Sequence, residues 1–176
     1  MNFLETDIEG IVLIDPERLE DERGFFARTY CRREFEERGL DPALAQCSIS
    51  FNRERGTLRG MHYQSAPHEE SKLVRCTQGA VYDVVVDLRR GSPTFKRWLG
   101  VELSASNRRM IYIGGGLAHG FLTLTPDAEL FYQISDFYRP EAAHGVRWDD
   151  AAFAIDWPAE PSVISERDRN LPDFEA

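Results

Sequence analysis

Histidine is the side chain best suited to acid–base chemistry near neutral pH, and this chain has four of them. His62 lies in the segment TLRGMHYQ, close to Arg59, and His119 lies in GGGLAHGF, directly after three glycines. The other two are His68 and His144. A lone histidine is as often a hydrogen-bonded structural residue as a catalytic base. The residue types alone therefore leave both interpretations open for each histidine.

The three glycines at residues 114–116 are a second feature that could serve chemistry, because glycine-rich loops cradle phosphate groups. The run lacks the Lys-Ser/Thr ending and the following helix that such a loop needs. We therefore interpret it as a tight turn from which the chain enters a strand.

Metal binding would need several ligands at one point. Small barrels often hold iron or zinc through a His-x-His pair, but the residue two after His62 is Gln64, and the sequence has no His-x-His. His68 and Glu69 follow closely, yet Pro67 makes it difficult for this segment to bring them to one point with His62. The spacing disfavours a metal site, and we expect none.

The elements that must position these residues are short strands separated by turn residues. The segments GSPT, GGG, TPD and RPEAAHG supply glycine and proline where the backbone turns. Helix is scarce, since only residues 32–38 are rich in helix formers before Gly39. About nine strands at this spacing predict an all-β antiparallel sandwich or barrel. The expected strands are residues 11–14, 46–52, 72–77, 80–88, 97–103, 110–113, 119–125, 128–135 and 153–157.

Alternation along the strands predicts which side chains share a face. Gln46, Ser48 and Ser50 fall on one face of residues 46–52, and Asp83 lies on the face of residues 80–88 that also carries Val81 and Val85. A small barrel with polar side chains pointing inward predicts a wet cavity rather than a packed core. Such a cavity usually binds a small molecule.

Composition bounds the class of protein. The 176 residues include 21 basic and 30 acidic side chains, for a net charge of −9, which disfavours a nucleic-acid partner. The sequence has neither a long apolar run nor a basic N-terminal region, so we expect no membrane span and no signal peptide. Its three cysteines lack CxxC spacing, as in reduced thiols. We expect a single-domain cytoplasmic protein spanning residues 1–176.

The segments LRGMHYQ (58–64), KLVR (72–75) and SPTF (92–95), with several other motifs, together resemble the dTDP-4-dehydrorhamnose 3,5-epimerase family. They cover nearly the whole chain, and the combination of LRG-x-HYQ with KLVR and SPTF is highly specific. The resemblance implies a cupin-like double-stranded β-helix, or jelly-roll barrel, with a few short helices. The segments that carry it are DERGFF (21–26), TLRGMHYQ (57–64), KLVRCTQGAVYDVVVDLRRGSPTF (72–95), AHGF (118–121), Tyr132, YRP (138–140), GVRW (145–148) and RD (167–168).

The activity implied by the resemblance is epimerisation of a nucleotide-linked 4-keto-6-deoxy sugar at C3, C5 or both. The C4 ketone acidifies the hydrogens on C3 and C5, so inversion needs a base on one face, an acid on the other and a group that holds the enolate oxygen. If a cation holds that oxygen, the reaction needs no cofactor.

Four catalytic roles follow from the resemblance. His62 is the expected base, Asp168 the carboxylate that orients it, Lys72 the cation that stabilises the enolate, and Tyr132 the proton donor. The residues by themselves also allow another interpretation of three of these positions. Without the resemblance, we would interpret Asp168 as a solvated residue in a polar tail, Lys72 as a surface lysine and Tyr132 as a core aromatic.

The resemblance also implies a nucleotide-binding end and a homodimer. Arg23 and Arg59 match residues that contact the diphosphate, and Phe26 and Tyr138 match aromatics that sandwich the base. In the family, the DERGFF strand crosses to the partner subunit's site. The remaining expected substrate contacts are Arg28, Gln46, Ser48, Lys72, Arg167 and His119, the last supported by Asp83.

Several recognition positions depart from the family pattern. Arg28 stands where the family has a glutamate that can accept the N3–H of thymine, whereas arginine only donates. Cytosine and guanine offer acceptors, so we hypothesise a preference for a base other than thymine, unless Arg28 points to solvent or to a phosphate. The other departures are Cys47 and Ser48 in place of Asp-Asn, Ala143 in place of glutamate, and Asp149-Asp150 in place of Asn-Asp.

Three other functions remain as alternatives. The first is a related single-centre epimerase that acts on a CDP- or GDP-linked keto-sugar. The second is a non-catalytic sugar-nucleotide binder, which retention of the base, carboxylate, lysine and tyrosine argues against. The third is a metal-dependent oxygenase on the same type of barrel.

Overall fold

The computed structural model describes residues 1–175, which form two β-sheets facing each other. One sheet has the strand order β1-β2-β10-β7-β12-β5, and the other has the order β13-β6-β11-β8-β9, with β14 pairing parallel to β6. The elements are β1 Asn2–Glu5, β2 Ile11–Asp15, β3 Arg18–Asp21, β4 Gly24–Ala27, α1 Arg32–Glu36, β5 Gln46–Asn52, β6 Thr57–Gln64, β7 Lys72–Gln78, β8 Ala80–Asp87, β9 Trp98–Ser104, β10 Met110–Ile113, β11 Leu117–Thr123, β12 Ala128–Ile134, β13 Ala143–Gly145, β14 Val163–Ile164 and α2 Glu166–Arg169.

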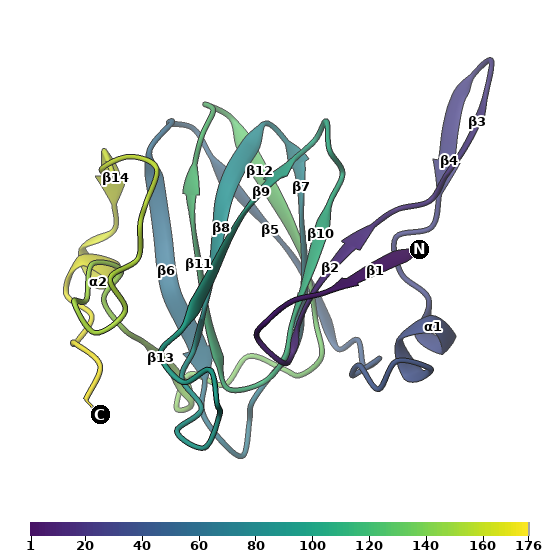
Figure 1. Cartoon of the computed structure of the whole chain (residues 1–176). Coiled ribbons are helices and arrows are strands. Elements are labelled where there is room, and N and C mark those ends of the chain that lie inside the picture. Colours follow the sequence, from purple (N-terminus) through teal and green to yellow (C-terminus); the bar gives the residue numbers. More distant parts are fainter. Residues whose placement is uncertain (176) are drawn as a thin grey trace.

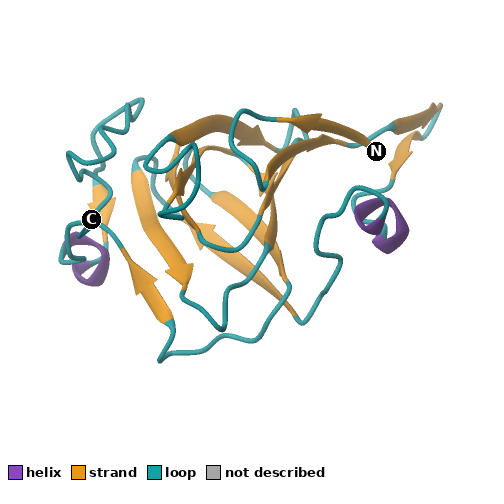
Figure 2. Cartoon of the chain, turned by 60° about the horizontal axis from the view of Figure 1, so that its bottom comes forward, coloured by secondary structure: helices purple, strands orange, loops and turns teal. Residues whose placement is uncertain are grey.

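The chain passes repeatedly between the two sheets. From β5 to β8, and again from β9 to β13, each successive strand lies in the other sheet. The strands therefore enclose a common interior, while the two short helices lie outside it (Figures 1 and 2). The expectation of an all-β barrel with few helices is confirmed.

The interior combines a packed core with a cavity, so the prediction of a wet cavity in place of a core was only half right. Val81, Val85 and Leu130 are fully buried between the sheets, with Phe121 beside them. Asp83 lies on the same inward face of β8, as the alternation predicted. The sequence pattern shows which side chains point inward but not how far the apolar ones fill the space.

Flanking segments cover the outer faces of the sheets. Phe35 of α1 packs against Leu73 and Tyr112 on the outer side of the first sheet. The C-terminal segment places Phe153 and Phe174 over Val84 and other residues on the outer side of the second. Burial on both faces explains why β8 reads as a nearly continuous apolar run.

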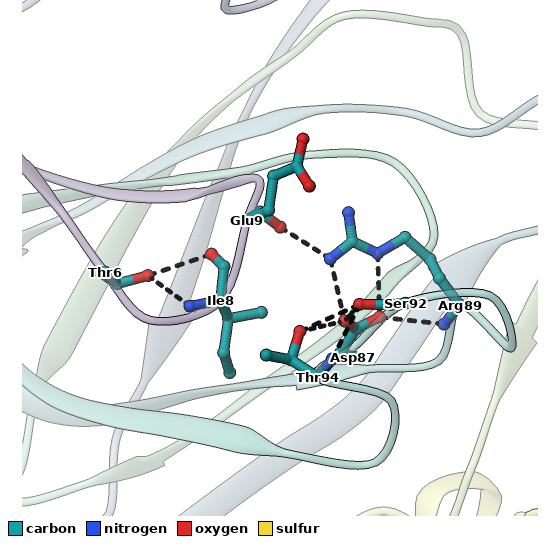
Figure 3. Close-up of polar contacts among 7 residues, drawn as sticks. All are labelled: Thr6, Ile8, Glu9, Asp87, Arg89, Ser92 and Thr94. Atoms are coloured by element: carbon teal, nitrogen blue, oxygen red, sulfur yellow. Dashed lines mark hydrogen bonds and ion pairs between the residues drawn. The ribbon is translucent and has the colours of Figure 1, made fainter.

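A polar network ties together the loops at one end of the barrel (Figure 3). The Asp87 carboxylate accepts hydrogen bonds from the Arg89 guanidinium at 2.9 Å, Ser92 Oγ at 2.6 Å and Thr94 Oγ1 at 2.7 Å. Arg89 also donates to the Glu9 carbonyl at 2.7 Å. Burial opposes ionisation of Asp87, but these donors outweigh it and hold the pKa of Asp87 well below its usual value. The network joins the loop after β8 to the turn between β1 and β2.

Several segments differ from the predicted elements, among them the short strands β1, β3, β13 and β14, which were not predicted. Residues 153–157 form the end of a turn and irregular backbone rather than a strand, because their apolar side chains pack on the outer face of the second sheet without a neighbouring strand. The segment at β6 was not among the predicted strands, since Gly60 interrupts its pattern. A Cβ at Gly60 would lie 2.5 Å from Gly120 Cα, so the close approach of β6 and β11 requires glycine there.

Strands β3 and β4 form a hairpin that stands away from the barrel (Figure 1). At its base, the Arg18 and Arg108 guanidinium carbons lie 5.1 and 4.8 Å from the centre of the Phe25 ring. Phe26 is 70% exposed on this hairpin. Of the residues described, no helix is long and apolar enough to cross a membrane.

Candidate active site

A cavity of about 280 Å³ opens between the inner faces of the two sheets. Strands β6 and β11 form one wall, and β5, β7 and β12 form the other. Basic and hydroxyl side chains dominate its polar lining. The lining residues are Ser48, Ile49, Ser50, Arg59, His62, Lys72, His119, Phe121, Tyr132 and Ile134.

His62 is paired with Asp168, although 106 positions separate them in the sequence. His62 Nε2 lies 2.8 Å from Asp168 Oδ1, and the Gly60 amide donates to Asp168 Oδ2 at 3.3 Å. Helix α2 positions the carboxylate, because the Asp168 amide donates to Ser165 Oγ at the helix N-cap.

The environment of Asp168 keeps it ionised. Burial opposes its negative charge, but the hydrogen bonds with His62 and the Gly60 amide outweigh that cost and lower the pKa of Asp168. An ionised Asp168 requires a proton on His62 Nε2. The lone pair then lies on Nδ1, which makes this nitrogen the basic atom of the ring.

His119 and Asp83 form a second pair deeper in the barrel. His119 Nε2 lies 2.8 Å from Asp83 Oδ2, while the buried Asp83 Oδ1 has no hydrogen-bond partner among residues 1–175. Complete burial raises the pKa of Asp83, and the neighbouring His119 opposes this effect. The two His–Asp pairs therefore share a geometry but shift their carboxyl pKa values in opposite directions.

Tyr132 projects into the cavity from β12, with its ring edge-on to His119 at a centroid distance of 6.0 Å. Burial raises the pKa of Tyr132 well above its usual value, and the Asp83 carboxyl adds to this effect. The phenol consequently carries its proton throughout the neutral range, as a proton donor must.

Lys72 is the first residue of β7. It faces inward, on the same side of the strand as the core residues Val74 and Cys76. Its Nζ lies 2.6 Å from Glu70 Oε1, and each of these side chains is only 10% exposed. Sequence reasoning did not identify Glu70. The only signal was an acidic residue two positions before the lysine.

Arg59 differs from the other basic residues of the cavity. Its Nε donates to Asn52 Oδ1 at 2.7 Å, and the Asn52 amide group in turn donates to the carbonyls of Ser50 and Ala128. In the described part of the chain, no carboxylate lies within ion-pair distance of Arg59. Its positive charge is therefore available to an anionic ligand.

The structure does not bring the expected nucleotide-binding residues of the hairpin to this cavity within one chain. Arg23 pairs with Asp21 at 2.6 Å, and Arg28 lies 3.3 Å from Glu34 of α1. Together with Phe26, Arg28 lines a separate cavity of about 310 Å³. The groups suited to proton transfer are thus assembled, whereas the hairpin residues lie elsewhere.

The remaining expected contacts lie around the cavity rather than in its lining. The Tyr138 amide donates to Gln46 Oε1 at 2.7 Å, and the Tyr138 ring is largely exposed. Arg167 is exposed on α2, next to Asp168. Among the residues described, no group of three or more His, Cys, Asp or Glu side chains is arranged to hold a metal ion.

Comparison with known proteins identifies the family. The model of a family described as dTDP-4-dehydrorhamnose 3,5-epimerase matches residues 5–176. The chain belongs to this family. The resemblance inferred from the motifs and the cupin-like fold it implied are thereby confirmed.

Individual relatives agree with this assignment over nearly their full length. A dTDP-4-dehydrorhamnose 3,5-epimerase from Shigella flexneri is 41% identical over 99% of this chain and 96% of its own. The Bacillus anthracis epimerase structure with TDP and PPi bound has a TM-score of 0.94 at 40% identity, covering 98% of this chain and 99% of that chain. A 3′-monoepimerase from Streptomyces bikiniensis in complex with dTDP-quinovose has a TM-score of 0.90 at 37% identity, covering 97% and 86%.

Proposed function

We propose that this chain is an epimerase that inverts C3, C5 or both in a nucleotide-linked 4-keto-6-deoxy sugar, through an enolate and without a cofactor. The observation that carries the proposal is the arrangement of two groups on opposite walls of one cavity. His62, with Asp168 behind it, lies on one wall, and Tyr132 lies on the other. A base and an acid on opposite faces of a substrate are what inversion of a carbon centre requires.

The proposed reaction removes a proton from one face of the sugar carbon and delivers a proton to the opposite face. His62 Nδ1 takes the proton from C3 or C5, and Asp168 stabilises the imidazolium that forms. The electrons of the broken C–H bond delocalise onto the C4 oxygen, where the Lys72 ammonium donates a hydrogen bond to the developing charge. Tyr132 then gives its proton to the opposite face of the carbon. Solvent takes the proton from His62 and restores that of Tyr132.

Arg59 is suited to hold the diphosphate of the substrate. It lies in the cavity lining without a carboxylate partner among the described residues, whereas His62, His119 and Lys72 each have one. A guanidinium makes bidentate hydrogen bonds to phosphate oxygens. We therefore expect the sugar to bind between His62 and Tyr132 and the diphosphate to bind at Arg59.

We further propose a homodimer in which each hairpin completes the partner's site. The exposed Phe26 on the projecting hairpin supports this arrangement, as does edge strand β5, where Ile49 is 63% exposed and Phe51 is also exposed. Nearby on the same sheet, the buried Arg75 Nε has no hydrogen-bond partner among the residues described. A second copy would cover this apolar face and bring Arg23 and Phe26 to the nucleotide.

We also propose a single domain spanning residues 1–176 in the cytoplasm. The two sheets share one core, which supports a single unit. The three free cysteines, Cys31, Cys47 and Cys76, fit a reducing compartment.

The base preference at position 28 stays a prediction. Arg28 is 58% exposed and pairs with Glu34 in the free chain, so its guanidinium must leave this partner to donate to a base. Competition among the four nucleoside diphosphates tests the hypothesis. Tightest binding of the cytidine or guanosine form supports it, whereas tightest binding of the thymidine form contradicts it and assigns Arg28 to solvent or phosphate.

Proton NMR in D2O tests the proposed activity directly, with the thymidine- and cytidine-linked 4-keto-6-deoxy sugars as substrates. Loss of the C3 or C5 proton signal, abolished by His62→Ala, establishes enolisation and identifies the reacting centre. Exchange at C3 alone would place the enzyme with single-centre epimerases. Binding without exchange for either substrate would indicate a sugar-nucleotide binder instead.

A further inference from the structure

The loop before β7 presents a carboxylate to the cavity's lysine. Glu70 Oε1 and Lys72 Nζ lie 2.6 Å apart, and both side chains are 90% buried. This is a close ion pair, shielded from the solvent that weakens surface ion pairs. The pair joins a residue outside the cavity lining to one that belongs to it.

Neighbouring hydrogen bonds fix the backbone that carries Glu70. The Ser71 amide donates to Ser135 Oγ at 2.8 Å, and the Ser135 amide donates to the Ser71 carbonyl at 3.0 Å. Ser71 Oγ also donates to Asp41 Oδ2 at 3.1 Å. Ser71 is thus held from two directions, so the position of the adjacent Glu70 is set by the fold rather than by its attraction to Lys72 alone.

The other carboxylates near the cavity are already engaged. Asp168 bonds His62, and Asp83 bonds His119. Glu70 is the carboxylate within ion-pair distance of Lys72 in the region the structure describes. The ion pair with Glu70 therefore fixes where the Lys72 ammonium lies, and the three N–H donors of an ammonium can serve a substrate oxygen from that position.

We propose that Glu70 is a positioning residue for Lys72, which holds the ammonium at the cavity wall where it can donate to the C4 oxygen of the substrate. This inference rests on the proposed function. A lysine side chain has several rotatable bonds, and an ion pair that holds its ammonium in place removes much of that freedom before the substrate binds. Glu70 itself touches no reacting atom.

Substitutions at Glu70 test the role through the kinetic constants. We expect Glu70→Ala to lower kcat by about tenfold to a hundredfold, with a change in KM of less than about threefold, because the misplaced ammonium matters most when charge develops on the oxygen. Glu70→Gln should recover only part of the loss, since its amide oxygen attracts the ammonium but carries no net charge. Glu69→Ala is the matched control, because the neighbouring Glu69 lines a different cavity.

A double-mutant cycle separates this role from a structural one. If Glu70 acts through Lys72, Glu70→Ala causes no further loss in a Lys72→Ala background. Equal losses of kcat in both backgrounds would overturn the inference, as would a Glu70→Ala enzyme with wild-type kcat. A separate readout is the ¹³Cε and ¹⁵Nζ NMR signal of Lys72, which should shift in Glu70→Ala but not in Glu69→Ala.

The same experiment distinguishes failure of this inference from failure of the proposed function. A wild-type enzyme that exchanges no proton on either keto-sugar would overturn the proposed function, and this inference with it. A wild-type enzyme that exchanges protons while Glu70→Ala matches it would overturn the positioning role alone.

Discussion

At the scale of single residues, the basic side chains of the cavity differ in whether a carboxylate partner balances their charge. His62, His119 and Lys72 each meet a carboxylate, while Arg59 meets the neutral amide of Asn52. The paired groups suit steps in which charge appears and disappears within one turnover, because the partner is already in place. The unpaired arginine suits a group that stays anionic throughout, as a diphosphate does.

Replacement of Tyr132 by phenylalanine should separate proton exchange from inversion. Without the phenol, His62 can still remove a proton and return a solvent-derived one to the same face. We expect Tyr132→Phe to lose inversion by about a hundredfold or more, while hydrogen–deuterium exchange at the carbon persists at a reduced rate. NMR in D2O measures exchange, and chromatography of the product sugars measures inversion. Equal loss of both would assign the donor role to another group.

At the scale of secondary-structure elements, the Asp87–Arg89 network and the cavity lie toward the same end of the strands, since Leu117 pairs with Asp87 and His119 follows two residues later on β11. The network fixes the turn after β1 and the loop after β8. The cavity lies between the sheets where β5, β6, β7, β11 and β12 place polar side chains inward. The network thus fixes loops that follow the strand ends near the cavity, and the same strands continue away from these loops into the packed core.

Asp87→Asn should therefore destabilise the fold without altering the chemistry. The folded-state pKa of Asp87 is lowered, so its contribution to stability is complete above its unfolded pKa of about 4 and is lost as the pH falls through the folded pKa. We expect the variant to lose about 1–3 kcal/mol in unfolding free energy at pH 7. Urea denaturation between pH 7 and pH 3 measures this loss.

The difference between the wild type and Asp87→Asn should shrink as the solution is acidified. Asp149→Asn serves as the control, because Asp149 forms an exposed ion pair with Arg147 and should change stability little. A stability difference that stays constant down to the lowest pH would show that Asp87 stabilises the barrel by packing rather than by its charge.

Prediction from sequence succeeded where a pattern is local. The alternation in Gln46–Asn52 and the apolar run Met110–Ile113 gave strands with the bounds that the structure has. It failed at Thr57–Gln64, where a glycine required by close strand contact hides the alternation, and at residues 153–157, where apolar side chains cover a sheet without joining it. Local patterns do not report such tertiary contacts.

The site shows the same limit. The family likeness placed His62 and Asp168 together, and the structure brings them to 2.8 Å, but neither alternation nor spacing could show a contact across 106 positions. The Lys72–Glu70 pair escaped notice because it depends on the path of a loop, which Ser71 anchors through three hydrogen bonds. Side-chain chemistry can be read from residue types, whereas partners across loops require coordinates.

At the scale of the whole molecule, one chain carries the proposed proton-transfer groups and the expected nucleotide-binding groups in separate places. His62 and Tyr132 line the barrel cavity, while Phe26 and Arg23 are exposed on the hairpin. The proposed exchange of hairpins between two copies would unite them. It would also cover the exposed residues of β5.

Complementation between two inactive variants tests this exchange. In a mixed dimer of His62→Ala and Phe26→Ala chains, one site combines an intact His62 with an intact hairpin from the partner. If the variants are mixed in equal amounts during refolding, we expect roughly a quarter of wild-type turnover to return. Each variant refolded alone provides the baseline. Activity that stays at this baseline, despite dimers in light scattering, would contradict the exchange.

The hairpin of residues 18–27 forms a two-stranded sheet of its own, outside both walls of the barrel. Substitutions in this hairpin should therefore have little effect on the packing of the residues that line the cavity. Under the proposed exchange of hairpins, such substitutions would change part of the nucleotide's surroundings while the proposed proton-transfer groups stay in place. Substrate range could then evolve in part separately from the chemistry.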